Sequence, residues 1–174
     1  HRVEQLVVDI AQVDREFDPA RDHVAAVGVH LDEADGAATI GLVAVRDGDD
    51  YVINGQKVFI TNGHSADLLL LACKTDPRAR AKGVSLLLVE TDRPGFTRGR
   101  KLEKIGCKAQ DTAELFFSDL RVPMTNVLGV EGNGFAMLMT QLAQERLIQA
   151  IRAIASAEAA LRWTLDYVVQ REMF

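Results

Sequence analysis

Two patterns of apolar and polar residues divide the chain, one of short period up to Pro123 and one of helical period after Gly129. Between residues 43 and 123, short apolar runs alternate with turn residues, which is typical of antiparallel β-strands. We expect strands over residues 67–74, 83–90, 96–100 and 112–117, with a polar loop over 75–82. Several short strands at this spacing predict a small antiparallel β-barrel or sandwich.

The segment 44–61 carries the clearest local signal. Its Asn54-Gly55 pair separates two apolar runs, and such a pair favours a two-residue hairpin because both residues must adopt positive φ. The run Asp-Gly-Asp-Asp at 47–50 predicts a second turn just before it. A compact antiparallel meander is therefore expected to begin here.

The strand after Asn54-Gly55 alternates in a way that separates two faces. Val58 and Ile60 are expected on the core face, while Phe59 and Thr61 lie on the opposite face. An aromatic ring and a hydroxyl group at one strand end are suited to contact with a planar ligand.

After Gly134 the chain contains neither glycine nor proline to its end. Apolar residues recur at helical spacing, as at Leu138, Leu142 and Ile148, among residues of high helix propensity. The glycine-rich run 129–134 is expected to be the turn that enters this helix. A helix this long needs neighbours, so we expect an α+β fold whose helix is the first of a truncated helical bundle.

Composition and charge argue against several classes of protein. Of the 174 residues, 48% are hydrophobic and 26% charged, which is ordinary for a globular protein. The net charge of -5 argues against nucleic acid as a partner, and no apolar run has the length of a membrane span. Cys73 and Cys107 lack metal-type spacing, and we expect reduced thiols that are buried or half-buried.

Residues 1–42 show no clean period and receive no functional assignment. His23 and His30 are interpreted as solvated surface residues because no cluster of ligand spacing accompanies them, and no metal is expected. The chain begins at His1 and ends within the predicted helix, so we interpret it as a fragment. We expect a β unit over 43–127 and the first bundle helix over 128–174.

Glu145 is the residue that the pattern singles out for chemistry. It follows Leu142 by three positions and Leu138 by seven, so the three share one helical face. A carboxylate on an apolar face loses hydration, which raises its pKa toward the range of a general base. The alternative is a helix-surface glutamate beside Arg146 or Arg152. No nucleophile triad and no phosphate-binding glycine fingerprint is present.

Four runs, in order, resemble the acyl-CoA dehydrogenases. They are NGQKVFITNG at 54–63, GRKLEKIGCKAQDTAELFFSDLRVP at 99–123, LGVEGNGFAMLMTQLAQERL at 128–147 and QREMF at 170–174. The resemblance extends from about Val43 to Phe174 and covers the family's central β domain and first long helix of its C-terminal bundle. The third run is most similar to the long-chain type, with the isovaleryl type as a relative.

This resemblance implies a flavin site on the strand after the Asn-Gly pair. In the family, the flavin of FAD packs against the strand that matches Phe59, Ile60 and Thr61. Phe59 occupies the position of the aromatic against the ring, and Thr61 that of the hydroxyl bonded to the flavin edge. The alternative is a core side chain followed by a strand-end threonine.

The resemblance also implies roles on the helix. Glu145 stands in the -ER-L context of the long-chain and isovaleryl types, which implies that it is the catalytic base. Gln144 and Arg146 match positions that line the acyl-CoA site. Arg171 and Phe174 match an R-x-x-F motif that contacts FAD across a dimer interface. The alternatives are surface polar residues, a solvated arginine and a buried phenylalanine.

The implied activity is FAD-dependent α,β-dehydrogenation of acyl-CoA thioesters in fatty-acid β-oxidation. A base removes the α-proton, a β-hydride passes to the flavin, and electrons leave to an electron-transfer flavoprotein. The resemblance further implies a homodimer or homotetramer in the bacterial cytoplasm or the mitochondrial matrix. Two other hypotheses remain: a non-catalytic β-barrel binding module, and a diverged flavin oxidase relative with its base elsewhere.

The chain departs from the family before residue 43. The family has a segment of the type T-E-P-G-A-G-S-D that contacts flavin and substrate, whereas residues 30–43 read HLDEADGAATIGLV. Only Glu33, Gly36 and Ala37 resemble that segment, and residues 1–42 do not resemble the family's N-terminal helical domain. We therefore expect this chain to lack half of the flavin site and to be inactive alone.

Overall fold

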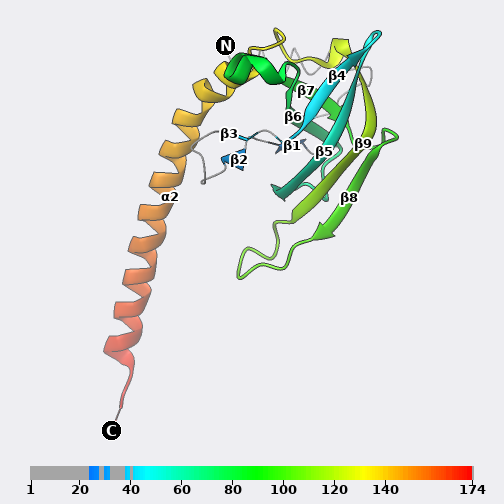
Figure 1. Cartoon of the computed structure of the whole chain (residues 1–174). Helices are drawn as coiled ribbons and strands as arrows, with labels where there is room; N and C mark the ends of the chain where they lie inside the picture. The colour runs from blue at the N-terminus through cyan, green and yellow to red at the C-terminus, as the bar shows by residue number, and fades with distance from the viewer. Residues whose placement is uncertain (1–23, 28–29, 32–37, 40, 174) are drawn as a thin grey trace. The chain divides into compact units, whose positions relative to one another are not determined.

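A computed structural model describes residues 24–27, 30–31, 38–39 and 41–173 (Figure 1). The chain divides into two units, residues 1–135 and residues 136–174, and each is considered by itself. The first holds the β-strands and the second nearly all of one long helix. The expected α+β class is confirmed.

The strands of the first unit form one large mixed sheet. They are β1 (Val24–Val27), β4 (Val43–Asp47), β5 (Asp50–Thr61), β6 (Leu68–Lys74), β7 (Val84–Glu90), β8 (Phe96–Lys101) and β9 (Thr112–Pro123). Their order is β1-β6-β4-β5-β9-β8, with β7 also paired to β6. A second sheet pairs β2 (His30–Leu31) with β3 (Ala38–Thr39), and short 3₁₀ turns lie at Pro77–Gly83 and Met124–Asn126.

Two features of this sheet differ from the expected antiparallel barrel or sandwich. β1 runs parallel to β6, and β4 meets β6 in parallel through Val43 and Lys74, so the sheet is mixed. Among the described strands, β1 and β8 lie at opposite ends of the pairing order, so the sheet is open. The predicted strands over 67–74, 83–90 and 96–100 are confirmed, and the predicted end at Pro123 is the end of β9.

The core of the first unit is built from side chains on the inner faces of these strands. Its largest fully buried members include Tyr51, Leu42, Ile53, Leu69, Leu71, Leu87, Leu115 and Leu120. Every residue of β7 is buried, which explains its continuous apolar run. Cys73 is a buried free thiol as expected, whereas Cys107 is exposed, which corrects the expectation of burial there.

The predicted Asn54-Gly55 hairpin is wrong. The hairpin between β4 and β5 lies instead at the second predicted turn, where Asp47 pairs with Asp50. Asn54 and Gly55 lie inside β5, which continues to pair with β9 on both sides of a register shift. The cross-strand bonds on either side of the pair therefore override its local turn preference.

The special conformation expected at Gly55 is nevertheless present. Its φ is +134°, and a Cβ atom there would lie 2.7 Å from the carbonyl oxygen of Gly41. At this register shift, Asn54 forms two hydrogen bonds with Asp119 on β9. The Asn54 amide donates to the Asp119 carboxylate at 3.1 Å, and the Asp119 N–H donates to Asn54 Oδ1 at 2.8 Å. The Asn-Gly pair thus forms a cross-strand irregularity and not a turn.

The long helix α2 spans Gly134–Gln170, 37 residues, and follows the glycine-rich turn as expected. Ser85 on β7 is fully buried, and its Oγ accepts the N–H of Gly132 at 2.8 Å. Gly134 packs so closely on β7 that a Cβ there would lie 2.8 Å from the Ser85 carbonyl carbon. These contacts fix where the helix begins.

Beyond that start, α2 exposes large apolar side chains such as Leu147, Ile151 and Ile154. Such exposure fits the expectation that this helix requires further helices to bury its faces. Among the described residues, no helix is both long and apolar enough to cross a membrane.

The close approach of Gly134 to β7 yields a stability prediction. Gly134→Ala should lower the free energy of unfolding by about 1–3 kcal/mol, because the added methyl group meets backbone atoms that cannot move aside. The matched control is Gly41→Ala, where the nearest atom to an added Cβ is 4.0 Å away. Urea unfolding followed by circular dichroism measures both. Equal free energies of unfolding for the two variants would contradict this account of the helix start.

Candidate functional site

The end of β5 departs from regular pairing with β9 at the residues predicted to meet a ligand. Lys57 pairs with Leu115 and Ile60 with Ala113, so two residues of β5 oppose one residue of β9. This is a β-bulge, a feature that redirects side chains and is common next to binding sites. The bulge contains Val58 and Phe59.

The bulge changes which side chains face the core. Val58 was expected beside Ile60 in the core, but it is 36% exposed, and Lys57 is the buried neighbour instead. The extra residue shifts the alternation by one position. Ile60 remains buried at 8% exposure, and Thr61 is exposed as expected. Any contact of Ile60 with a ligand would therefore use its backbone.

Phe59 is held in a strained conformation with its ring outside the core. Its φ is +62°, in the left-handed region that non-glycine residues avoid, and its side chain is 65% exposed. Such strain costs on the order of 1–3 kcal/mol and persists only where the surrounding structure enforces it. Here the paired residues on both sides of the bulge enforce it. The result is an exposed aromatic ring on a constrained backbone, two positions before a strand-end threonine.

The electrostatics beneath the bulge are set by burial. Lys57 is 5% exposed, and burial lowers its pKa, although the neighbouring Cys73 acts in the opposite direction. Burial also raises the pKa of the Cys73 thiol to about 12, so this sulfur is protonated and unreactive at neutral pH.

The turn that follows Thr61 is tied to the start of β9. Asn62 donates its N–H to the backbone oxygen of Asp111 at 3.0 Å. The Asp111 carboxylate accepts the N–H groups of His64 at 2.9 Å and Ser65 at 3.2 Å. The Ser65 hydroxyl adds a bond of 2.7 Å. This turn therefore has a defined conformation next to the candidate ligand face.

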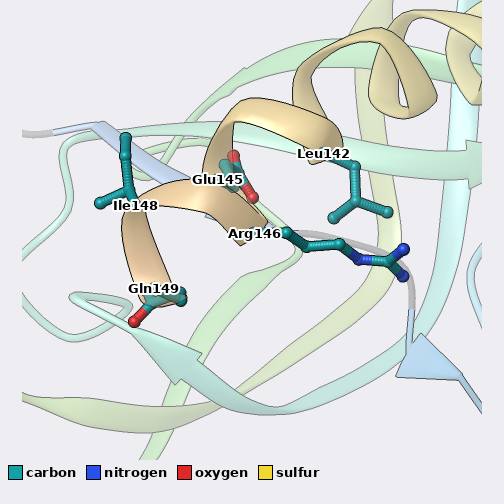
Figure 2. Close-up of a pocket in the computed structure, with 5 residues that line it drawn as sticks. All are labelled: Leu142, Glu145, Arg146, Ile148 and Gln149. Carbon is teal, nitrogen blue, oxygen red and sulfur yellow. The ribbon is translucent and has the colours of Figure 1, made fainter. Parts of the chain in front are cut away.

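The second group of predicted residues lies on α2. Leu142, Glu145, Arg146, Ile148 and Gln149 line a hollow of about 340 Å³ (Figure 2). Leu142 and Leu138 are half-buried, but Glu145 is exposed, so the predicted loss of hydration at its carboxylate is not seen in this chain. The two units are described separately, and the role of Glu145 stays a prediction.

The other residues predicted to bind substrate or cofactor lie on α2 or just after it, except those outside the described residues. Gln144 is exposed on α2 and does not line the hollow, whereas Arg146 does. Arg171 follows the helix, and its guanidinium donates to the hydroxyl of Tyr167 while lying 5.7 Å from the centre of that ring. Phe174 lies outside the described residues, as do Glu33, Gly36 and Ala37.

His23 and the side chain of His30 also lie outside the part of the chain that the structure describes. Within the part of the chain that the structure describes, no group of three or more His, Cys, Asp or Glu residues could hold a metal ion.

Sequence reasoning found the exposed ring and hydroxyl but missed two features that hold them. A bulge cannot be read from an unbroken apolar run, because it arises from the register of β9. Asp111 was missed because its partners are 46 and 47 positions away in the chain. The polar run Gln110-Asp111-Thr112 before a strand was the available signal.

Comparison with known proteins covers both units. A family model described as acyl-CoA dehydrogenase, middle domain, matches residues 33–120, and one described as acyl-CoA dehydrogenase, C-terminal domain, matches residues 132–174. The crystal structure of an acyl-CoA dehydrogenase from Geobacillus kaustophilus is 54% identical, with a TM-score of 0.78, over 87% of this chain and 40% of that one.

Two curated relatives differ in the substrates that their names state. The mitochondrial long-chain specific acyl-CoA dehydrogenase of Sus scrofa is 50% identical over 75% of this chain and 31% of its own length. The cyclohex-1-ene-1-carbonyl-CoA dehydrogenase of Syntrophus aciditrophicus (strain SB) is 46% identical over 75% of this chain and 32% of its own. The chain thus spans about a third of the length of these relatives.

The strain at Phe59 predicts an unusual sign for one substitution. Phe59→Gly should raise the free energy of unfolding by about 0.5–1 kcal/mol, because glycine adopts positive φ without steric cost. Phe116→Gly is the matched control, since Phe116 is also partly exposed but pairs regularly with Gln56. It should lower the free energy by about 1 kcal/mol. Urea unfolding that shows an equal loss for both variants would contradict the strain.

Proposed function

The chain belongs to the acyl-CoA dehydrogenase family, and we propose that the protein containing it is an FAD-dependent enzyme that introduces an α,β double bond into acyl-CoA thioesters. The observation that carries this proposal is the strained, exposed Phe59 next to Thr61 at the end of β5. The family resemblance assigns the flavin to that same strand end.

The residues at this strand end fit a flavin. Phe59 presents an aromatic face outside the core, which suits stacking against a planar ring system. Thr61 is exposed two positions later and offers a hydroxyl group that can donate or accept a hydrogen bond at the ring edge. Because Ile60 between them is buried, the backbone at this point is anchored to the core.

The reaction requires a base, and the family resemblance assigns this role to a residue of α2. The α-carbon must lose a proton and the β-carbon a hydride, and FAD, when bound, supplies the hydride acceptor. Glu145 is the proposed base that takes the α-proton, from the hollow on α2 that also contains Leu142 and Ile148. An α-proton of a thioester is too weakly acidic for a carboxylate in water, so water must be excluded from this hollow in the active protein.

The other proposed roles follow the family motifs. Gln144 and Arg146 contact acyl-CoA, and Arg171 with Phe174 contacts FAD across an interface between subunits. The proposed partners are an electron-transfer flavoprotein and a second copy of the protein in a homodimer or homotetramer. The proposed compartment is the bacterial cytoplasm or the mitochondrial matrix. The acyl group is left open, because relatives of similar identity act on long-chain and on cyclic substrates.

The role of Glu145 can be tested in the protein that contains this chain. Glu145→Gln should lower kcat by about 10²–10⁴-fold with flavin retained, because glutamine has the same shape but cannot accept the α-proton. Glu158→Gln is the control, since Glu158 is another exposed glutamate of α2, and it should leave kcat unchanged. Activity of Glu145→Gln within about tenfold of the unmodified protein would reject Glu145 as the base.

A second prediction concerns the 174-residue chain by itself. We expect that it neither retains FAD nor oxidises acyl-CoA, because residues 30–43 contain little of the family's flavin-contacting sequence and α2 exposes large apolar side chains such as Ile151 and Ile154. The measurement is flavin absorbance of the purified chain together with acyl-CoA turnover by an artificial electron acceptor. A yellow preparation with turnover would show that the site is complete within this chain.

A further inference from the structure

The turn between β5 and β6 is joined to the start of β9 by one carboxylate. Asp111 immediately precedes β9 and is 8% exposed. Its two oxygens together accept the N–H of His64, the N–H of Ser65 and the hydroxyl of Ser65, at 2.9, 3.2 and 2.7 Å. Its backbone oxygen accepts the N–H of Asn62 at 3.0 Å. One residue therefore satisfies four donors of a single short turn.

The charge of Asp111 strengthens this connection. Burial alone would raise the pKa of Asp111, but the hydrogen bonds from His64 N–H and from Ser65 outweigh burial and hold the pKa below its ordinary value. The carboxylate is therefore ionised at neutral pH, and hydrogen bonds to an ionised acceptor are stronger than neutral ones.

The turn held by Asp111 continues directly from the ligand-facing strand end. Thr61 pairs with Thr112, so the last pair of the β5–β9 ladder lies next to both Asn62 and Asp111. Asn62 has φ +58° and Phe59 has φ +62°, so two left-handed non-glycine residues stand three positions apart. Residues keep such a strained backbone conformation only where contacts with the surrounding structure enforce it.

The far side of the turn is also fixed, by a different residue. Ala66 donates its N–H to the backbone oxygen of Asn62 at 3.0 Å, and its own oxygen accepts from the guanidinium of Arg98 at 2.6 Å. Arg98 thus holds Ala66, just before β6, whereas Asp111 holds Asn62, His64 and Ser65. The bond nearest to the candidate flavin face uses the Asp111 backbone oxygen, and the carboxylate bonds follow at His64 and Ser65.

We propose that Asp111 is a positioning residue: its carboxylate holds His64 and Ser65, its backbone oxygen holds Asn62, and the turn held in this way fixes the backbone that presents Phe59 and Thr61. The consequence for a flavin rests on the proposed function, but the tether itself does not. Asp111 touches no reacting group in this account and acts only through the strand end.

The test compares Asp111→Asn with Asp119→Asn in the 174-residue chain without flavin. Asp119 is also an aspartate associated with β9, but it binds Asn54 and not the turn. Asparagine at position 111 keeps the shape but loses the charge and one acceptor. Amide exchange at His64 and Ser65, whose N–H groups bond to the carboxylate, should accelerate by about tenfold or more, and exchange there in Asp119→Asn should not change.

A second readout separates positioning from stabilisation. Backbone chemical shifts report φ and ψ, so the Cα and Hα resonances of Phe59 and Thr61 should move in Asp111→Asn. A role in stability alone would lower the free energy of unfolding and leave these resonances in place, which would overturn the proposal. Acceleration of exchange spread evenly over β5, β6 and β9 would overturn it as well.

If Asp111→Asn does not fold, Ser65→Ala decides, because it removes one of the three bonds to the carboxylate. Relative to the unmodified chain, Ser65→Ala should accelerate amide exchange at His64 and Ser65 and shift the Thr61 resonances. Unchanged exchange and shifts in Ser65→Ala would overturn the proposal. Failure of the parent protein to bind FAD would count against the proposed function alone, since these readouts use no flavin.

Discussion

The antiparallel pairing of β5 with β9 is the interaction on which the rest of this structure depends. It extends from the pair Asp50–Pro123 to the pair Thr61–Thr112, and it places Ile53, Leu115 and Leu120 in the core. Two irregularities interrupt it, and both are held by regular pairs on either side. The strain at Phe59 is stable for this reason, since relaxing it would require breaking buried strand pairs.

The sequence allowed the strands after residue 67 and the long helix to be predicted, because their apolar periods are set by local burial. It could not supply the position of β1 beside β6, or the bulge at Val58, since both depend on which distant strands meet. The Asn54-Gly55 pair shows the limit most clearly. Its positive φ at Gly55 was predictable, but β9 converted the expected turn into a strand irregularity.

For the candidate site, too, the sequence allowed some residues to be predicted but not the contacts that support them. Alternation predicted an exposed ring and hydroxyl at one strand end, and Phe59 and Thr61 are exposed, but the bulge also exposes Val58, which alternation had placed in the core. The support beneath them was not predictable, because Asp111 lies 47 positions after His64 in the chain, with β6, β7 and β8 between them. On α2, the three-residue spacing predicted that Glu145 and Leu142 share one helical face, and both line the same hollow. Its exposure in this chain reflects a helix face that the described residues do not cover.

We propose above all that Phe59 and Thr61, at the end of β5, contact the flavin of FAD. The most direct measurement is a crystal structure of the protein containing this chain with FAD and an acyl-CoA analogue. The account predicts the flavin ring against Phe59 with Thr61 at its edge, and the Glu145 carboxylate next to the α-carbon of the acyl group. A ring bound elsewhere, or Glu145 directed away from the acyl group, would contradict it.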